Sequence, residues 1–524
     1  MRMAEPYAED HNLTDDTGIS GWRVWRSMKK KLVIVGGGIA GLSTGVYALA
    51  NGFEAEIYEM HRMAGGECTG WDRGDYHFDG CIHWLMGCKR GTNMNRVWRF
   101  VGALDDSVDI IVRESFGTLV SGNSTVTLYT DPRRLREHLL EVSLEDRNGI
   151  TELCGAIEGL RGMEIPWAKP FDMMGPIDMV KMGLSMRPYL RYMKYQKMTV
   201  GELAEGFRSP LIRTLLLNSM PAEYSAMSLV STLASLSTGD SGWPRGGSRA
   251  LARRVEKRFL DSGGKILFGK RASRILVDNG LAQGVEFSDG SQVLADAVVT
   301  ATDGYEALYG LLQGGYLSKL HERMFSDTEG PPVQMSFQAW AGVAADLSGE
   351  PESVSLQLDE PVRLGGDEHT RIWLMHYSYD RSMAPPGHSV VTSFFPTSDF
   401  DWWRELYQEK EAYRAEKDRI ASVVKDAIEN QYSAAEGRVG VMDVATPMTY
   451  VRYCNAWRGA WMSWISTPDL PARYLPMRLR GLKGFVMAGQ WIMPPGGLPV
   501  AALSGRWAVQ HLCAAERRPF VSEE

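Results

Sequence analysis

The chain has few of the patterns that hold metals or disulfide frameworks. Its 524 residues contain six cysteines and ten histidines. No Cys-x-x-Cys pair or His-Glu-x-x-His motif occurs, and the spacing of Cys81 and Cys88 fits no common pair of metal ligands. These absences argue against a disulfide scaffold and against a metal site, and they favour reduced, mostly buried thiols.

Long apolar runs and an excess of positive charge are also missing. No stretch of about 18 apolar residues occurs, so the sequence predicts no spanning helix. A net charge of −7 argues against nucleic-acid binding, which needs a basic face. Residues 1–27 are polar and acidic and lack the apolar core of a secretory signal, so we expect a cytoplasmic protein. We expect the fold to begin near Met28, after a flexible extension or an upstream start.

What the chain does contain is a βαβ unit near its start. Residues 32–35 are an all-apolar run, typical of a strand buried on both faces of a parallel sheet. Residues 42–50 predict a helix, and residues 55–59 predict a second strand. The first strand and the helix are joined by the glycine turn Gly36-Gly37-Gly38-Ile39-Ala40-Gly41. This order of elements is the one that a dinucleotide-binding fingerprint requires.

Each part of this unit has a physical role in binding a dinucleotide. Gly36 and Gly38 permit a tight turn that brings the backbone close to a pyrophosphate, and Gly41 lets helix and strand pack closely. The helix N-terminus presents free N–H groups and a partial positive charge to the phosphates. Glu59 ends the second strand, where its carboxylate can accept hydrogen bonds from ribose hydroxyls. The unit therefore predicts a bound dinucleotide.

The residues after Glu59 decide between NAD and FAD. Arg62 and the pair Gly65-Gly66 stand where FAD enzymes of the glutathione-reductase-like superfamily carry an arginine and two glycines. In those enzymes the arginine steadies the pyrophosphate, and the glycines let the chain pass close to the flavin ribityl. The alternative is a surface arginine beside an ordinary Gly-Gly turn. The pattern favours FAD.

Several later motifs give the chain a specific resemblance to a known family. In chain order they are Arg73-Gly74-Asp75-Tyr76-His77-Phe78-Asp79, Trp243-Pro244-Arg245-Gly246-Gly247-Ser248, Ala282-x-Gly284-Val285, Asp296-x-Val298-Val299, Asp380-x-x-Met383-Ala384-Pro385-x-Gly387, Thr446-Pro447-Met448-Thr449 and Gly489 through Gly505. With these motifs the chain resembles the phytoene desaturase, carotenoid isomerase and retinol saturase family. The resemblance implies an α/β fold with a glutathione-reductase-like, FAD-binding Rossmann domain, a discontinuous mixed α+β substrate domain and a helical lid.

The resemblance also implies roles for two later segments. Ala272 starts the strand whose backbone pairs with the adenine in related flavoproteins. Gly497-Leu498-Pro499 begins a helix whose N-terminal amides would face the flavin N1–C2=O edge and stabilise an anionic reduced flavin. Gln490 departs from the wider superfamily, where an acid often holds a ribityl hydroxyl. The predicted FAD-binding residues are Gly36, Gly38, Ile39, Ala40, Gly41, Glu59, Met60, Arg62, Gly65, Gly66, Glu67, Ala272, Gly489, Gln490, Gly497, Leu498 and Pro499.

The pattern of elements and the resemblance together predict the domain division. We expect an N-terminal extension (1–27), FAD-binding segments 28–110, 240–305 and 478–524, and substrate-domain segments 111–239, which includes the lid, and 306–477. Residues 263–303 and 331–397 indicate mainly strands, and residues 401–430 one charged amphipathic helix. Residues 176–198 mix methionines with lysines and arginines. This segment either lies on a membrane surface or is a lid helix with buried methionines and solvated lysines.

The reaction is predicted less narrowly than the cofactor. No second glycine fingerprint for a nicotinamide domain occurs, so a hydride partner must visit the flavin pocket, or electrons must leave to oxygen, a quinone or another protein. The resemblance implies an elongated apolar substrate that is desaturated or saturated through hydride transfer at flavin N5. The alternatives are redox-neutral cis-trans isomerisation, amine oxidase-like C–N oxidation and a non-catalytic flavoprotein that carries lipid or a partner.

Candidate catalytic side chains are few. His83 could reach the flavin face or be a packed histidine. His376 and Tyr377, with Asp380, could form a proton relay or a structural hydrogen-bond cluster. Arg452 could bind a carboxylate or phosphate of the substrate, or pair with a surface acid. The expected pocket-wall tryptophans are Trp84, Trp461, Trp464 and Trp491.

Overall fold

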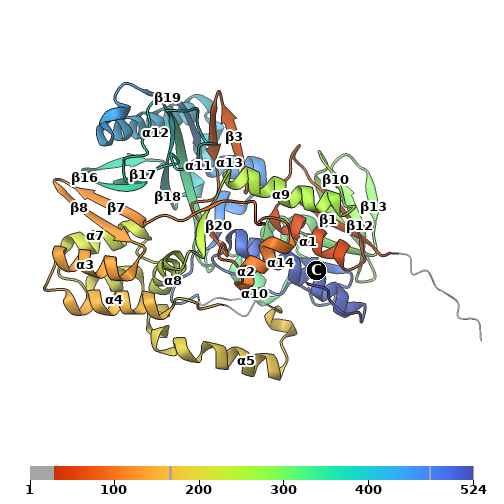
Figure 1. Cartoon of the computed structure of the whole chain (residues 1–524). Helices are drawn as coiled ribbons and strands as arrows, with labels where there is room; N and C mark the ends of the chain where they lie inside the picture. The colour runs from red at the N-terminus through yellow and green to blue at the C-terminus, as the bar shows by residue number, and fades with distance from the viewer. Residues whose placement is uncertain (1–28, 165–167, 471–473, 523–524) are drawn as a thin grey trace, which may run out of the picture.

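The computed structural model describes residues 29–164, 168–470 and 474–522 (Figure 1). The predicted N-terminal extension, residues 1–27, lies outside the described residues. The predicted βαβ unit is confirmed, with β1 at Lys31–Val35, α1 at Ile39–Ala50 and β2 at Glu54–Tyr58. Helix α1 begins earlier than residue 42 because Gly38 is its N-cap, so the last part of the glycine turn is already helical.

A five-stranded parallel sheet is built around β1. Its order is β10-β2-β1-β14-β21, and its other strands are β10 (Lys265–Leu267), β14 (Ala297–Thr300) and β21 (Phe485–Met487). These strands come from three separate parts of the chain, yet all of them pair in parallel. Their carboxyl ends therefore meet at one edge of the sheet, which is where ligands bind in open α/β sheets.

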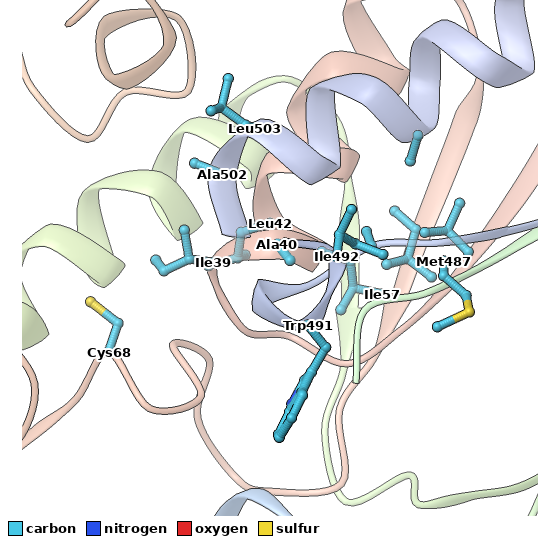
Figure 2. Packing of buried hydrophobic residues seen from close by; sticks show 14 of the residues in the cluster. Ile39, Ala40, Leu42, Ile57, Cys68, Met487, Trp491, Ile492, Ala502 and Leu503 are labelled. Carbon is cyan, nitrogen blue, oxygen red and sulfur yellow. The ribbon is translucent and has the colours of Figure 1, made fainter. Parts of the chain in front are cut away.

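Helices α9 (Gly247–Asp261) and α14 (Gly497–Ala515) both pack on α1, and all three helices contact this sheet. Figure 2 shows Leu42 of α1 and Leu503 of α14 in the buried layer that the two helices share. The helices approach closely because Gly505 has no side chain. A Cβ at Gly505 would lie only 2.6 Å from the backbone nitrogen of Thr44. The α1–α14 contact brings the C-terminal motif to the glycine turn.

A mixed sheet forms the other half of the molecule, at the upper left of Figure 1. Its order is β19-β15-β18-β17-β16-β7-β8, and β20 pairs with β15. The strands are β7 (Ser115–Ser121), β8 (Ser124–Tyr129), β15 (Val333–Val343), β16 (Ser353–Leu364), β17 (Asp367–His376), β18 (Ser389–Thr397), β19 (Val439–Ala445) and β20 (Ala460–Trp464). The predicted β-rich region 331–397 is thus confirmed.

The prediction of a single helix over residues 401–430 is wrong. Two helices occur there, α11 (Phe400–Gln408) and α12 (Lys410–Gln431). Glu409 separates them with a non-helical backbone, at φ −96° and ψ 83°. Trp403 of α11 packs against Phe337 of β15, whereas α12 buries other apolar side chains in the same core. The sequence pattern predicts one amphipathic helix, but packing on the sheet divides the segment into two helices.

The remaining elements are short. The predicted strands within 263–303 are confirmed by the parallel sheet and by a small antiparallel sheet of β11 (Ala272–Asp278), β12 (Leu281–Phe287) and β13 (Gln292–Leu294). The other strands are β3 (Gly70–Arg73), β4 (Tyr76–Asp79), β5 (Leu85–Met86), β6 (Ile110–Ile111) and β9 (Ser241–Pro244). The other helices are α2 (Asn93–Phe100), α3 (Pro132–Val142), α4 (Arg147–Gly159), α5 (Pro176–Met186), the 3-10 helix η2 (Arg187–Gln196), α6 (Val200–Glu205), α7 (Pro210–Ser219), α8 (Ala226–Ser237), α10 (Lys319–Met324) and α13 (Pro447–Cys454). Among the helices of the described ranges, none is both long enough and apolar enough to cross a bilayer.

Candidate functional site

A cavity of about 1460 Å³ reaches from the carboxyl edge of the parallel sheet to the mixed sheet. The predicted cofactor residues on its wall are Gly36, Gly38, Ile39, Ala40, Glu59, Met60, Gly65, Gly66, Glu67, Ala272, Gly489, Gln490, Gly497, Leu498 and Pro499. Two predicted residues are not on the wall. Gly41 packs behind the turn, and Arg62 is exposed at the surface.

The glycine turn leaves space for a ligand because it has no room for side chains of its own. Gly36 has a φ of +101°, and a Cβ there would lie 2.6 Å from the carbonyl oxygen of Ala301. A Cβ at Gly41 would lie 2.0 Å from the carbonyl oxygen of Gly36. The Gly65 N–H donates to the Gly37 carbonyl at 2.9 Å, so the second glycine segment is bonded directly to the first. Together the two segments form a backbone cradle.

Glu59 is tied into this cradle through both of its carboxylate oxygens. Its Oε2 accepts the N–H of Gly37 at 2.6 Å, and its Oε1 accepts the N–H of His61 at 2.7 Å. A carboxylate oxygen has two lone pairs, so each can accept one further bond from a ribose hydroxyl. Ala272, at the start of β11, lines the same part of the cavity.

The C-terminal motif contains a hydrogen-bonded chain that the sequence does not reveal. The Gly497 N–H donates to Gln490 Oε1 at 3.1 Å, and Gln490 Nε2 donates to Glu67 Oε2 at 2.9 Å. Pro499 has no N–H, so within the described residues Leu498 has the one uncommitted amide among the first three of α14. Gln490 itself therefore occupies one of the amides that were expected to face a flavin.

Acidic groups at this end of the cavity hold their protons more tightly than usual. Burial and, to a smaller extent, the nearby carboxylate of Asp303 raise the pKa of Glu67 to about 8, although the bond from Gln490 opposes the shift. Burial also raises the pKa of Asp303 to about 6, against three backbone N–H donors. Near pH 7 the Glu67 carboxyl is therefore mostly neutral. Glu67 therefore does not supply the negative charge that an acid at position 490 would bring.

The other end of the cavity is an aromatic chamber. Its wall includes His83, Trp84, Phe116, Trp373, Phe394 and Trp461. The His83 ring lies 5.3 Å from that of Trp373 and 5.6 Å from that of Trp461. Burial and, to a smaller extent, the charge of Arg113 lower the pKa of His83 to about 4, so the imidazole is neutral near pH 7. In the described part of the chain its ring nitrogens have no hydrogen-bond partner.

The other two predicted catalytic residues lie off the cavity wall. His376 Nε2 is 3.2 Å from the carbonyl oxygen of Glu350, with which it can form a hydrogen bond, and its ring contacts Tyr432. Tyr377 packs against Trp243, with ring centres 4.9 Å apart.

The carboxylate of their neighbour Asp380 is already engaged in hydrogen bonds to the protein. Its Oδ2 accepts the Trp243 indole N–H at 2.8 Å and the Gly246 N–H at 2.7 Å. The residues around Asp380 therefore fasten the segment that precedes α9. Arg452 is exposed and also lies off the wall.

Sequence reasoning missed several wall residues. Trp84, Trp461 and Trp491 line the cavity as expected, and Figure 2 shows Trp491 projecting away from the buried helix layer. Trp464 instead lies in the core, where its indole donates to the Met324 carbonyl at 2.9 Å. The missed residues of the chamber include Arg113, Phe116, Trp373 and Phe394. The sequence signal for Arg113 is its place directly after the apolar run 110–112.

Comparison with known proteins agrees with this geometry. The family described as flavin containing amine oxidoreductase matches residues 39–513. Prolycopene isomerase of carrot (Daucus carota) is 21% identical over 510 residues, which cover 93% of this chain and 81% of that protein. A 4,4'-diapophytoene desaturase of Methylomonas is 20% identical over 525 residues, 94% of this chain and 96% of that protein. Cyclohexylamine oxidase of Brevibacterium oxydans shares the fold, with a TM-score of 0.55 at 14% identity over 94% of this chain and 100% of that one.

Proposed function

We propose, since the chain belongs to the flavin-containing amine oxidoreductase family, that this FAD-dependent enzyme desaturates or saturates carbon–carbon bonds in an apolar, isoprenoid- or carotenoid-like molecule. The observation that carries the proposal is a single cavity that joins a dinucleotide cradle to an aromatic chamber. Redox-neutral cis-trans isomerisation is the second candidate, and the likeness to prolycopene isomerase favours it. Amine oxidase-like C–N oxidation remains compatible with the shared fold.

The residues of the cradle fit FAD. The glycine turn at the start of α1 would hold the pyrophosphate, and Glu59 the adenosine ribose. The amide of Leu498 would face the flavin, while Gln490 keeps Gly497 in place. When bound, the isoalloxazine ring supplies a two-electron acceptor or donor for a hydride. The protein's own contribution is to orient the ring and the substrate and to exclude water.

The aromatic chamber supplies the substrate site of the proposal. Aromatic walls grip an elongated apolar molecule by contact area rather than by charge. His83 lies on the wall of the aromatic chamber, and its imidazole is neutral near pH 7, so it can donate or accept one hydrogen bond to the substrate. We retain His83 as the acid–base candidate. His376 and Tyr377 are not part of the proposed mechanism, since they lie off the wall.

We further propose that α5 and η2 form the helical lid of a glutathione-reductase-like fold, with the FAD domain assembled from the three predicted segments. Met186 and Met193 of this lid line the cavity. Ile177, Val180 and Leu184 of α5 face solvent, with exposed fractions of 72%, 62% and 64%. Figure 1 shows α5 at the lower edge, away from both sheets. An exposed apolar face beside basic residues suits a membrane surface from which an apolar substrate could enter.

The test uses purified protein with its flavin, mixed without oxygen with candidate substrates. Prolycopene, 4,4'-diapophytoene and cyclohexylamine represent isomerisation, desaturation and C–N oxidation. Bleaching of the flavin by the phytoene compound supports the primary proposal, and product change without bleaching supports isomerisation. Bleaching by the amine alone would overturn both. Mass spectrometry of any co-purified apolar molecule would identify the natural substrate class.

A further inference from the structure

Arg113 is a buried cation that points at the cavity without an anion beside it. It lies just before β7, is only 6% exposed and lines the cavity wall. Within the described residues, its guanidinium makes one hydrogen bond, from Nη1 to the sulfur of Met375 at 3.2 Å. Across residues 29–164, 168–470 and 474–522, no carboxylate lies within ion-pair distance of its guanidinium. A buried arginine normally has such a partner, because an unpaired charge is costly to bury.

The other arginines of the cavity wall have oxygen acceptors. Arg371 donates to Asn218 Oδ1 at 2.8 Å, Arg458 pairs with Asp327 at 3.4 Å, and Arg271 donates to Asn455 Oδ1 at 3.3 Å. Glu352 is the acid whose pKa Arg113 affects. Burial raises the pKa of Glu352, and Arg113 offsets that shift only in part. Arg113 therefore differs from its neighbours in having unused donors.

The surroundings of Arg113 add further unused hydrogen-bonding groups. Strands β16 and β17 pair so that Ser353 is opposite Met375 and Ser355 is opposite Trp373. The Ser353 hydroxyl accepts the Trp373 indole N–H at 2.9 Å, but the buried Ser355 hydroxyl has no partner in the described ranges. His83, whose pKa Arg113 lowers, also lacks a partner there. Arg113, Ser355 and His83 line the same cavity, and we call these three residues the polar corner of an otherwise aromatic chamber.

We propose that this polar corner binds a carboxylate at one end of the substrate, so that the enzyme acts on an amphipathic polyene acid rather than on a pure hydrocarbon. The inference rests on the proposed function and narrows its substrate class. A guanidinium presents two parallel N–H donors, which match the two oxygens of a carboxylate. The anionic part of FAD does not compete, because its pyrophosphate belongs at the glycine turn of the other sheet. The aromatic walls would then hold the apolar chain.

The probes are all-trans-retinoic acid and its methyl ester, which share one polyene body and differ in the charge at one end. Both are titrated into FAD-loaded protein by equilibrium dialysis. We expect the wild-type protein to bind the acid at least about tenfold more tightly than the ester, the size of one charge-assisted hydrogen bond. Arg113→Met should weaken binding of the acid by about tenfold or more and leave the ester unchanged.

Two further variants keep the test decisive. Arg113→Lys retains the charge but loses the paired donors, so its preference for the acid should be intermediate, and it stands in if the methionine variant loses FAD. Arg134→Met removes an exposed charge near β8 that pairs with Glu114 at 2.9 Å, so it should keep the wild-type preference. Equal binding of acid and ester by wild type, or a preference that survives in both Arg113 variants, would overturn the carboxylate site alone. If neither the retinoids nor β-carotene bind, both the carboxylate site and the proposed apolar substrate class are contradicted.

Discussion

At the residue scale, Gly41 shows how the lack of one side chain sets the cofactor site. A Cβ there would lie 2.0 Å from the Gly36 carbonyl oxygen, which belongs to the same turn. We predict that Gly41→Ala displaces the turn and lowers the affinity for FAD. Overpacking of this kind costs about 1–3 kcal/mol, or about 10- to 100-fold in affinity. The ratio of flavin to protein absorbance after dialysis measures the loss.

Gly155→Ala is the matched control for this change. Gly155 lies within α4, and a Cβ there would meet nothing within 4 Å. The alanine should leave FAD content unchanged and stabilise the helix by up to about 1 kcal/mol. Full FAD retention by the Gly41 variant would show that the turn can relax without losing its function.

His376 provides a test of charge rather than of shape. Burial lowers its pKa to about 4, below the ordinary value of 6.5. Between pH 6.5 and 4 the unfolded chain therefore binds a proton that the folded chain does not, and the free energy of unfolding falls as the pH drops through this window. Between pH 7 and pH 4.5 the free energy of unfolding should fall less in His376→Gln than in the wild type, by on the order of 2 kcal/mol.

Denaturant unfolding at several pH values measures this effect. Because His376 lies off the cavity wall, the glutamine variant should keep its FAD and its turnover at pH 7. A large fall in turnover with unchanged stability would restore the catalytic role that the sequence predicts for this histidine.

At the element scale, α5 differs from the other long helices in having no buried residue. Its residues 177, 180 and 184 share one helical face. We predict that the protein sediments with vesicles containing anionic lipid and that added salt weakens this binding. Changing Ile177, Val180 and Leu184 together to serine should weaken binding by at least about 100-fold, because each apolar side chain contributes about 1.5–3 kcal/mol on burial.

Leu294→Ser is the control for the vesicle assay. Leu294 is 68% exposed on β13, in a different part of the fold. It should leave vesicle binding unchanged, and both variants should keep their FAD. A wild-type protein that stays in the supernatant with every vesicle would instead favour a lid without membrane contact.

At the scale of the whole molecule, the predicted cofactor-binding residues come from parts of the chain that are far apart. The cavity wall takes residues from the first βαβ unit, from the start of β11 and from the start of α14. A ligand that bridges these segments should stabilise the folded state as a unit. We predict that FAD at 100 times its Kd raises the free energy of unfolding by about 2.7 kcal/mol. Thermal unfolding of the flavin-free protein with increasing FAD measures the shift.

Riboflavin serves as the matched ligand because it lacks the pyrophosphate and the adenosine. It should raise the melting temperature less than FAD does, since the glycine turn and Glu59 would bind nothing of it. Equal shifts with both ligands would contradict the role given to the cradle.

Local elements followed the sequence closely, and their arrangement did not. The strands and helix of the first βαβ unit form where residues 32–35, 42–50 and 55–59 predict them. The helix over 401–430 is divided because Trp403 packs into the sheet core, which periodicity does not reveal. The Gln490–Glu67 bond joins residues more than 400 positions apart, so no local pattern predicts it.

The sequence by itself determined the cofactor class, because the glycine turn, Glu59 and the second glycine pair are contiguous and each needs a particular residue type. Only the tertiary structure decided the substrate chamber. Arg113, Trp373 and Phe394 come from three separate segments, just before β7, on β17 and on β18, and only the folded mixed sheet brings them to one cavity. The tertiary structure also places His376 and Tyr377 off the cavity wall. The His376 ring lies at hydrogen-bond distance from the Glu350 carbonyl, and the Tyr377 ring packs on Trp243.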